Sequence, residues 1–179
     1  MWKQCEALQA DIVSFRRALH QIPELGHDLP RTQAYLRQQL DSMGVSYTLS
    51  PVDSSLWGEI EGGKPGKTVL LRADTDALPI QEQTGLSCSS QIDGMMHACG
   101  HDAHAAMLLG ALQVLQTNRE HLSGKVRFVF QAAEECVSGA QKVVNRAFVT
   151  AWMPFSAVIS AISSTPRFPP VPLPSARAM

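Results

Sequence analysis

The sequence has no surplus of charge of either sign. Its 179 residues hold 15 Lys and Arg against 16 Asp and Glu, which gives a formal net charge of −1 and a pI near 6.6. This balance excludes nucleic-acid binding through a broad basic surface, so no nucleic-acid partner is expected. Apolar residues still make up 45% of the chain, which is enough for a sizeable core and excludes disorder throughout.

Long apolar runs and paired cysteines are also missing. The most apolar stretch, residues 147–162, is too short for a membrane span and contains Pro154. The N-terminal residues carry charge but no apolar core of a secretory signal. The cysteines form no Cys-x-x-Cys pair, which is typical of a reducing compartment. They are Cys5, Cys88, Cys99 and Cys136. These absences predict a cytoplasmic protein with no membrane partner.

The last part of the chain lacks the residues that a domain surface needs. All 12 glycines lie at or before Gly139, and residues 147–179 contain no Asp or Glu. That stretch has only Arg167 and Arg177 as charges and holds six of the 11 prolines. Because a packed domain needs turn glycines and a charged exterior, we divide the chain at residue 146. Residues 147–179 are interpreted as an aberrant proline-rich tail.

Residues 1–146 alternate between helix and strand patterns. Apolar side chains spaced by three or four residues, from Leu8 to Leu19, predict a first helix that Pro23 ends. Further helices are predicted over residues 32–43, 103–115 and 137–146. Strands are predicted over residues 45–49, 56–61, 68–71 and 126–130. Such interleaving predicts an α/β domain with a mostly parallel sheet flanked by helices.

Three polar clusters lie at the predicted carboxyl ends of strands, where active sites of open α/β sheets form. They are residues 72–79, 97–104 and 131–135. The second cluster brings three histidines and Cys99 within eight residues, a donor set suited to zinc, manganese, cobalt or nickel. Of the adjacent acids Glu134 and Glu135, one could bind the metal while the other moves a proton from water to a leaving amine.

Each residue also has a plainer interpretation. Asp74 and Asp76 could be turn residues at a strand end, and Asp102 could cap the following helix. Glu134 and Glu135 could be solvated, as most adjacent acids are. Because the three clusters are predicted to lie at one sheet edge, a shared metal site is favoured over separate turn, cap and solvent-exposed roles.

The motifs resemble those of the amidohydrolase branch of the aminoacylase-type metallopeptidases, which includes hippurate hydrolase, N-acyl-amino-acid amidohydrolases and auxin-conjugate hydrolases. They are FRRALHQIPELG at 15–26, RADTDALPI at 72–80, MHACGHDAH at 96–104 and FQAAEE at 130–135. The resemblance covers about residues 10–146. It implies a truncated catalytic domain of a dinuclear metallopeptidase-like fold, with two manganese or zinc ions per complete site. The implied substrate is a small N-acyl amino acid, and a homodimer is expected only of a full-length form.

By position, the resemblance implies metal ligation by Cys99, His101 and Glu135, with the thiolate bridging the ions. It implies Glu134 as the general base and acid, and Asp76 as a residue that orients a ligand. Ala132 and Ala133 stand where the group usually has proline before its glutamates, and Cys136 replaces the usual glycine after them. The group completes its site with two later histidines, whereas this chain has no histidine after His121.

Two alternatives follow. The missing ligands favour a non-catalytic fragment that binds metal weakly or does not fold. A cysteine hydrolase that uses Cys99 with His101 or His104 is the other alternative, although it would not need paired glutamates.

The genetic code offers an explanation of the tail. Suppose that the tail is read in a shifted frame, in which each codon joins the last base of one codon to the first two bases of the next. The codons of Trp152, Met153 and Pro154 then encode the pair Asp-Ala, whichever proline codon is used. Permitted third bases around this pair give a segment that resembles the family's continuation, including a histidine. A frameshifted tail should lack a partner surface and leave the sheet edge uncovered. Its large apolar side chains include Phe148, Trp152, Phe155 and Ile159.

Overall fold

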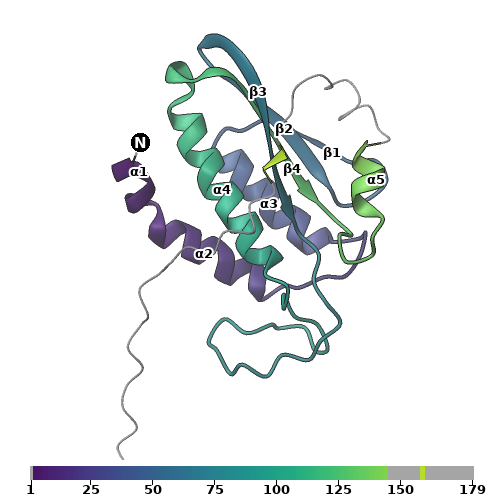
Figure 1. Cartoon of the computed structure of the whole chain (residues 1–179). Helices are drawn as coiled ribbons and strands as arrows, with labels where there is room; N and C mark the ends of the chain where they lie inside the picture. The colour runs from purple at the N-terminus through teal and green to yellow at the C-terminus, as the bar shows by residue number, and fades with distance from the viewer. Residues whose placement is uncertain (1, 145–157, 160–179) are drawn as a thin grey trace, which may run out of the picture.

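The computed structural model describes residues 2–144 and 158–159, which form a sheet with helices on both faces (Figure 1). The helices are α1 Trp2–Ala7, α2 Gln9–His20, α3 Pro30–Ser42, α4 His101–Thr117 and α5 Gly139–Val144, with a 3-10 turn at Arg119–His121. The strands are β1 Tyr47–Leu49, β2 Leu56–Glu61, β3 Lys64–Asp74, β4 Ser123–Gln131 and β5 Val158–Ile159. No helix within this part of the chain is long and apolar enough to cross a membrane.

The strand order is β1-β2-β4-β3-β5, so β2 and β3 follow each other in the chain but are separated by β4. The β3–β4 and β3–β5 pairs are parallel, whereas β1–β2 and β2–β4 are antiparallel. The predicted α/β fold is confirmed, with a sheet that is mixed. Only β2 runs opposite to the other described strands. Its connections to β1 and β3, residues 50–55 and 62–63, are short and contain no helix, whereas a parallel crossover needs a dozen or more residues.

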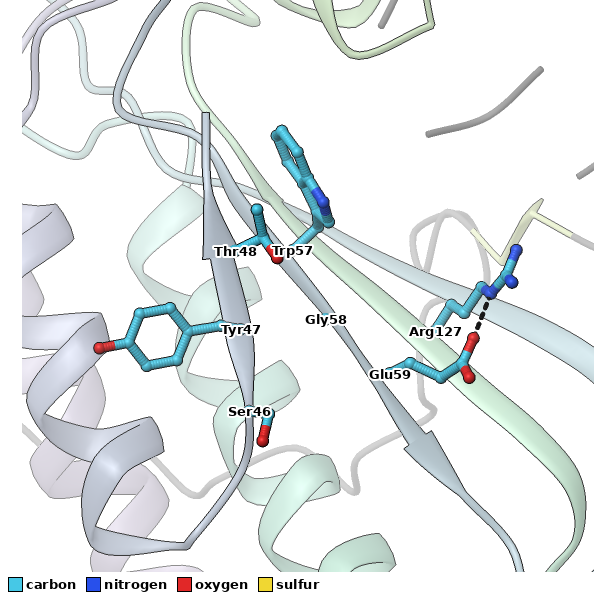
Figure 2. Close-up of a pocket in the computed structure, with 7 residues that line it drawn as sticks. All are labelled: Ser46, Tyr47, Thr48, Trp57, Gly58, Glu59 and Arg127. Carbon is cyan, nitrogen blue, oxygen red and sulfur yellow. Dashed lines mark hydrogen bonds and ion pairs between the residues drawn. The ribbon is translucent and has the colours of Figure 1, made fainter. Parts of the chain in front are cut away.

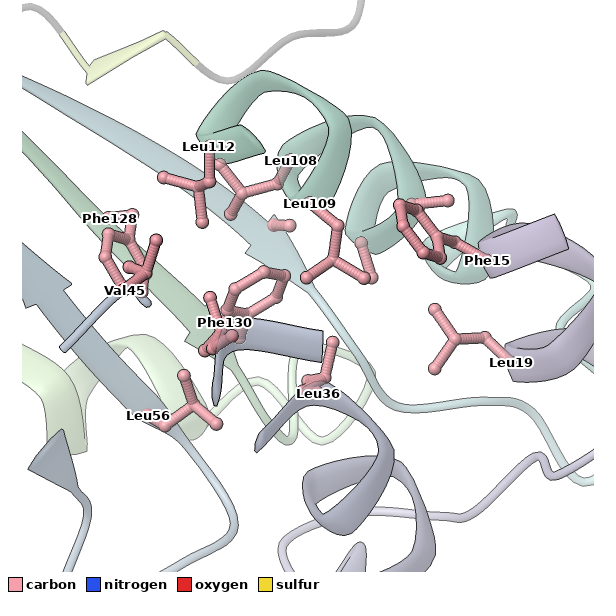
Figure 3. Close-up of a cluster of buried hydrophobic side chains, with 14 of the residues drawn as sticks. Phe15, Leu19, Leu36, Val45, Leu56, Leu108, Leu109, Leu112, Phe128 and Phe130 are labelled. Atoms are coloured by element: carbon pink, nitrogen blue, oxygen red, sulfur yellow. The ribbon is translucent and has the colours of Figure 1, made fainter. Parts of the chain in front are cut away.

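The main core fills the space between the sheet and helices α2, α3 and α4 (Figure 3). Phe128 and Phe130 alternate along β4 toward these helices and are fully buried, with their rings in an edge-to-face arrangement at 6.1 Å. Val129 points to the opposite face, where it packs with Leu70 and Val143 of α5. Burial on both faces explains why the three consecutive residues Phe128, Val129 and Phe130 are all apolar.

Element boundaries differ from those predicted mainly at turns. β3 begins at Lys64 rather than residue 68, with a register shift between Lys64 and Thr68. Gly62 and Gly63 there lie so close to the backbone of residues 120–124 that a Cβ would clash. The α4 helix begins at His101, two residues before the predicted start.

The β3 edge is partly covered. Leu70 and Leu71 pair with Val158 and Ile159 of β5, so the expectation of an uncovered edge is wrong at these residues. Phe148, Trp152 and Phe155 lie outside the described residues.

Candidate metal centre

The three polar clusters meet where β3 and β4 end. Asp74 pairs in register with Gln131, and both the backbone N–H and the hydroxyl of Thr75 donate to the Gln131 carbonyl at 2.9 Å. Because the two strands are parallel, the segments that follow them leave from the same sheet edge. The α4 helix begins beside them, which brings residues far apart in sequence into contact.

Asp76 connects all three clusters. Its fully buried carboxylate accepts hydrogen bonds from the backbone N–H groups of Glu134 and Glu135, one on each oxygen, both at 3.0 Å. Nδ1 of His101 lies 2.9 Å from the Asp76 carbonyl oxygen and 3.5 Å from its carboxylate. Burial alone would raise the pKa of Asp76, but these hydrogen bonds outweigh it and lower the pKa. Asp76 therefore positions both the imidazole and the paired glutamates.

Cys99, His101 and Glu135 converge, with one donor atom of each lying within 4.8 Å of the others. Gly100 separates the first two in the left-handed region, at φ 89°, which glycine adopts without strain. This turn directs the Cys99 thiol and the His101 ring toward the same point. Nε2 of His101 is 3.9 Å from Oε1 of Glu135 and 3.8 Å from Oε2 of Glu134, so the second glutamate adjoins the group.

The electrostatics of this group fit a cation. Oε1 of Glu135 is buried and has no hydrogen-bond partner among the described residues. Desolvation raises the pKa of the Cys99 thiol, and a hydrogen bond with Glu135 and the surrounding carboxylates raise it further. Desolvation lowers the pKa of His101, but its contacts with Asp76 outweigh this and raise it. A divalent ion would satisfy the orphan oxygen and favour the thiolate, so the donor set suits zinc or a similar metal.

Sequence reasoning missed a buried network behind the site. Asp102 accepts a hydrogen bond from Nε of Arg16 at 2.9 Å and lies 2.7 Å from Nδ1 of His20. The other ring nitrogen of His20 is 3.4 Å from Glu82, in the segment before α4. Arg16 and His20 are four residues apart on α2 and so share one face. The four-residue spacing of Arg16 and His20 was the sequence pattern that could have indicated this network. Through the network, the motif at residues 15–26 supports the start of α4.

The sequence also did not predict the backbone conformation around Glu134 and Glu135. Ala133 and Val137 have φ values of 58° and 57°, in the left-handed region that disfavours residues other than glycine. They flank the two glutamates on either side. The first of these turns presents two consecutive N–H groups to Asp76.

A separate pocket lies away from this centre, against β1, β2 and β4 (Figure 2). It has a volume of about 380 Å³, and an ion pair of 2.6 Å between Arg127 and Glu59 borders it. The other lining residues are Ser46, Tyr47, Thr48, Trp57 and Gly58. The pocket contains none of the predicted site residues.

Comparison with known proteins shows where these features recur. Peptidase family M20/M25/M40 matches residues 70–171. An N-acetyl-L-cysteine deacetylase of Bacillus subtilis is 43% identical over 138 residues, 77% of this chain and 33% of the relative. An N-acyl-L-amino acid amidohydrolase of Geobacillus stearothermophilus is 39% identical over 141 residues, 78% of this chain and 38% of the relative.

The fold agrees with these matches. A crystal structure of a dinuclear metal-binding peptidase of the M20 family from Bacillus subtilis has a TM-score of 0.77 at 40% identity, over 80% of this chain and 41% of that one. This chain therefore spans about a third to two-fifths of the length of these relatives. The resemblance predicted from the motifs is confirmed: the chain belongs to peptidase family M20/M25/M40, a family of hydrolytic enzymes.

Proposed function

We propose that this chain carries part of the active site of a metal-dependent amidohydrolase that cleaves N-acyl amino acids or small peptide-like amides. The observation that carries the proposal is the convergence of Cys99, His101 and Glu135, with Glu134 adjoining them. Relatives named as a deacetylase and an amidohydrolase of N-acyl amino acids support the substrate class. Because the chain spans about a third of those relatives, the complete activity belongs to a longer form.

Cys99, His101 and Glu135 would hold a divalent metal, manganese or zinc, two ions being bound in the complete site. When bound, such an ion supplies Lewis-acid polarisation of the amide carbonyl. Because Nδ1 of His101 lies 2.9 Å from the Asp76 carbonyl, it carries the proton and leaves Nε2 as the ligand atom. The reducing cytoplasm would keep Cys99 a free thiol, as it is here.

Glu134 has the geometry of a proton carrier. Its side chain is 42% exposed, so water and substrate can reach it, while its backbone N–H is fixed on Asp76. We assign it to take a proton from the attacking water and deliver it to the leaving amine. Asp76, fully buried, holds the backbone from which Glu134 extends.

The second candidate is a non-catalytic metal-binding fragment, which the lack of histidines after His121 favours. In this case the 179-residue chain would bind fewer than two ions and turn over no amide. A cysteine hydrolase is disfavoured, because desolvation and the nearby carboxylates raise the pKa of Cys99, whereas an activated nucleophile needs a lowered one.

Glu134→Ala tests the assignment in a full-length form that contains the missing ligands. We expect hydrolysis of hippurate-like amides with added manganese or zinc to fall by about 10²–10⁴-fold. Metal binding, measured by equilibrium dialysis, should not change. The exposed Glu120→Ala variant is the matched control. Unchanged turnover in Glu134→Ala, or no metal-dependent turnover at all, would contradict the proposal.

A further inference from the structure

A second group of potential ligands lies beside the first. Asp74, His101 and His104 place one donor atom each within 4.8 Å of one another. Asp74 ends β3, and its side chain is 10% exposed. His101 and His104 lie three residues apart in the first turn of α4, so they share a face, with ring centroids 5.4 Å apart.

His101 belongs to both groups, and this restricts how they are used. Its Nδ1 faces the Asp76 carbonyl at 2.9 Å, which leaves Nε2 as the ligand atom. Because one imidazole nitrogen binds one metal ion, the Cys99 group and the Asp74 group cannot both use His101 at the same time. An ion would occupy one group or the other.

We propose that Asp74, His101 and His104 form an alternative site for a divalent cation, to which the ion moves when the Cys99 thiolate is not available. The proposal rests on the proposed function only in treating Cys99, His101 and Glu135 as the first ligand set. Two histidines and one carboxylate are a donor set that binds borderline ions such as Fe²⁺. The thiolate-containing set instead prefers softer ions, so the two sites differ in the metal they favour.

Arg72 opposes the alternative site. Its Nη2 lies 2.5 Å from Oδ1 of Asp74, while its Nε donates to Oε1 of Gln131 at 2.8 Å and so holds the guanidinium in place. A cation would therefore share the Asp74 carboxylate with Arg72, using the second oxygen. Removing the guanidinium charge should strengthen the alternative site.

Cobalt titration of the 179-residue chain tests this, because cobalt bound by thiolate has a near-ultraviolet charge-transfer band. The wild-type chain should bind Co²⁺ with this band. Cys99→Ala should lose the band yet still bind Co²⁺, and adding His104→Ala should weaken that binding by at least about tenfold, the scale on which partners of metal sites act. Adding Arg72→Gln to Cys99→Ala should tighten it. His121→Ala, at an exposed histidine, is the control for His104.

The outcomes separate the two proposals. If the wild-type chain binds cobalt through thiolate but Cys99→Ala binds none, the alternative site is overturned and the first ligand set stands. Equal affinity of Cys99→Ala with and without His104→Ala overturns it as well, and His104→Gln repeats the comparison if circular dichroism shows that the alanine variant unfolds. If the wild-type chain binds no cobalt, the ligand set of the proposed function fails, and the alternative site fails with it.

Discussion

His97 lies 3% exposed in the segment that leads to α4, and neither of its ring nitrogens has a hydrogen-bond partner among the described residues. Desolvation lowers the pKa of His97 to about 4, against an ordinary value of 6.5. Between pH 6.5 and about pH 4, this histidine therefore binds a proton in the unfolded chain but not in the folded chain. Folding stability must fall as the pH falls through this window, by roughly 3 kcal/mol if the whole shift is realised.

The corresponding measurement is urea unfolding at pH 7 and at pH 4.5. The free energy of unfolding should be lower at pH 4.5, and His97→Gln should reduce the difference between the two pH values. His121→Gln, at an exposed position, should leave the difference as it is. An identical pH dependence in wild type and His97→Gln would show that the loss of stability comes from other groups.

Asp76 gives a prediction about backbone order. In Asp76→Asn, the side-chain oxygen can accept from only one of the Glu134 and Glu135 N–H groups, because the amide nitrogen is a donor. The unmatched buried group should cost about 1–3 kcal/mol. Amide hydrogen exchange at these two residues should accelerate, whereas Asp28→Asn, at an exposed acid, should change neither quantity. Unaltered exchange in Asp76→Asn would contradict the positioning role.

At the scale of elements, Gly58 fixes how closely β1, β2 and β4 pack. A Cβ at this residue would lie 2.3 Å from the Ser46 carbonyl oxygen and 2.5 Å from the Phe128 ring. Gly58→Ala should therefore lower the free energy of unfolding by about 1–3 kcal/mol or more through overpacking. Gly94→Ala is the comparison, since a Cβ there meets nothing within 4 Å and only its φ of 73° is unfavourable.

Urea unfolding of both glycine variants decides the matter. Gly94→Ala should cost about 1–2 kcal/mol, the penalty of a left-handed backbone for a residue with a Cβ. A Gly58→Ala variant as stable as Gly94→Ala would mean that β1 and β2 can move apart without loss.

The sequence predicted elements best where side-chain pattern alone determines them. The run 68–71 predicts a strand that lies within β3, and segment 97–104 carries its potential ligands close together. The β2–β4 pairing was not predictable, because the inward positions Leu56 and Ile60 suit either strand direction. The contacts of Asp76 were hidden for another reason: backbone N–H groups belong to every residue, so no sequence pattern marks them.

At the scale of the whole molecule, we propose that residues 1–146 are the N-terminal part of the catalytic domain and that the tail from residue 147 is read in a shifted frame. The composition break and the forced Asp-Ala pair support the shift. Two findings weigh against the shift: the family match reaches residue 171 in the frame as read, and β5 pairs with β3.

Resequencing the gene provides the test. In the shifted frame the missing histidine requires the third base of the Val158 codon to be cytosine, followed by the first two bases of Ile159. We expect this base, and we expect the restored frame to encode a longer, two-domain protein that binds metal more tightly than the 179-residue chain. Any other base at this position would exclude the histidine and end the proposal.

The place of β4 in the sheet has a consequence for synthesis on the ribosome. β2 can pair with β1 as it emerges, but its other edge and the first partner of β3 wait for β4, which lies between β2 and β3 and begins about fifty residues after β3 ends. Until Gln131 has left the ribosome, both strands expose unpaired edges that chaperones and proteases can recognise. The nascent chain should therefore resist proteolysis only after this strand emerges, in a single late step rather than gradually.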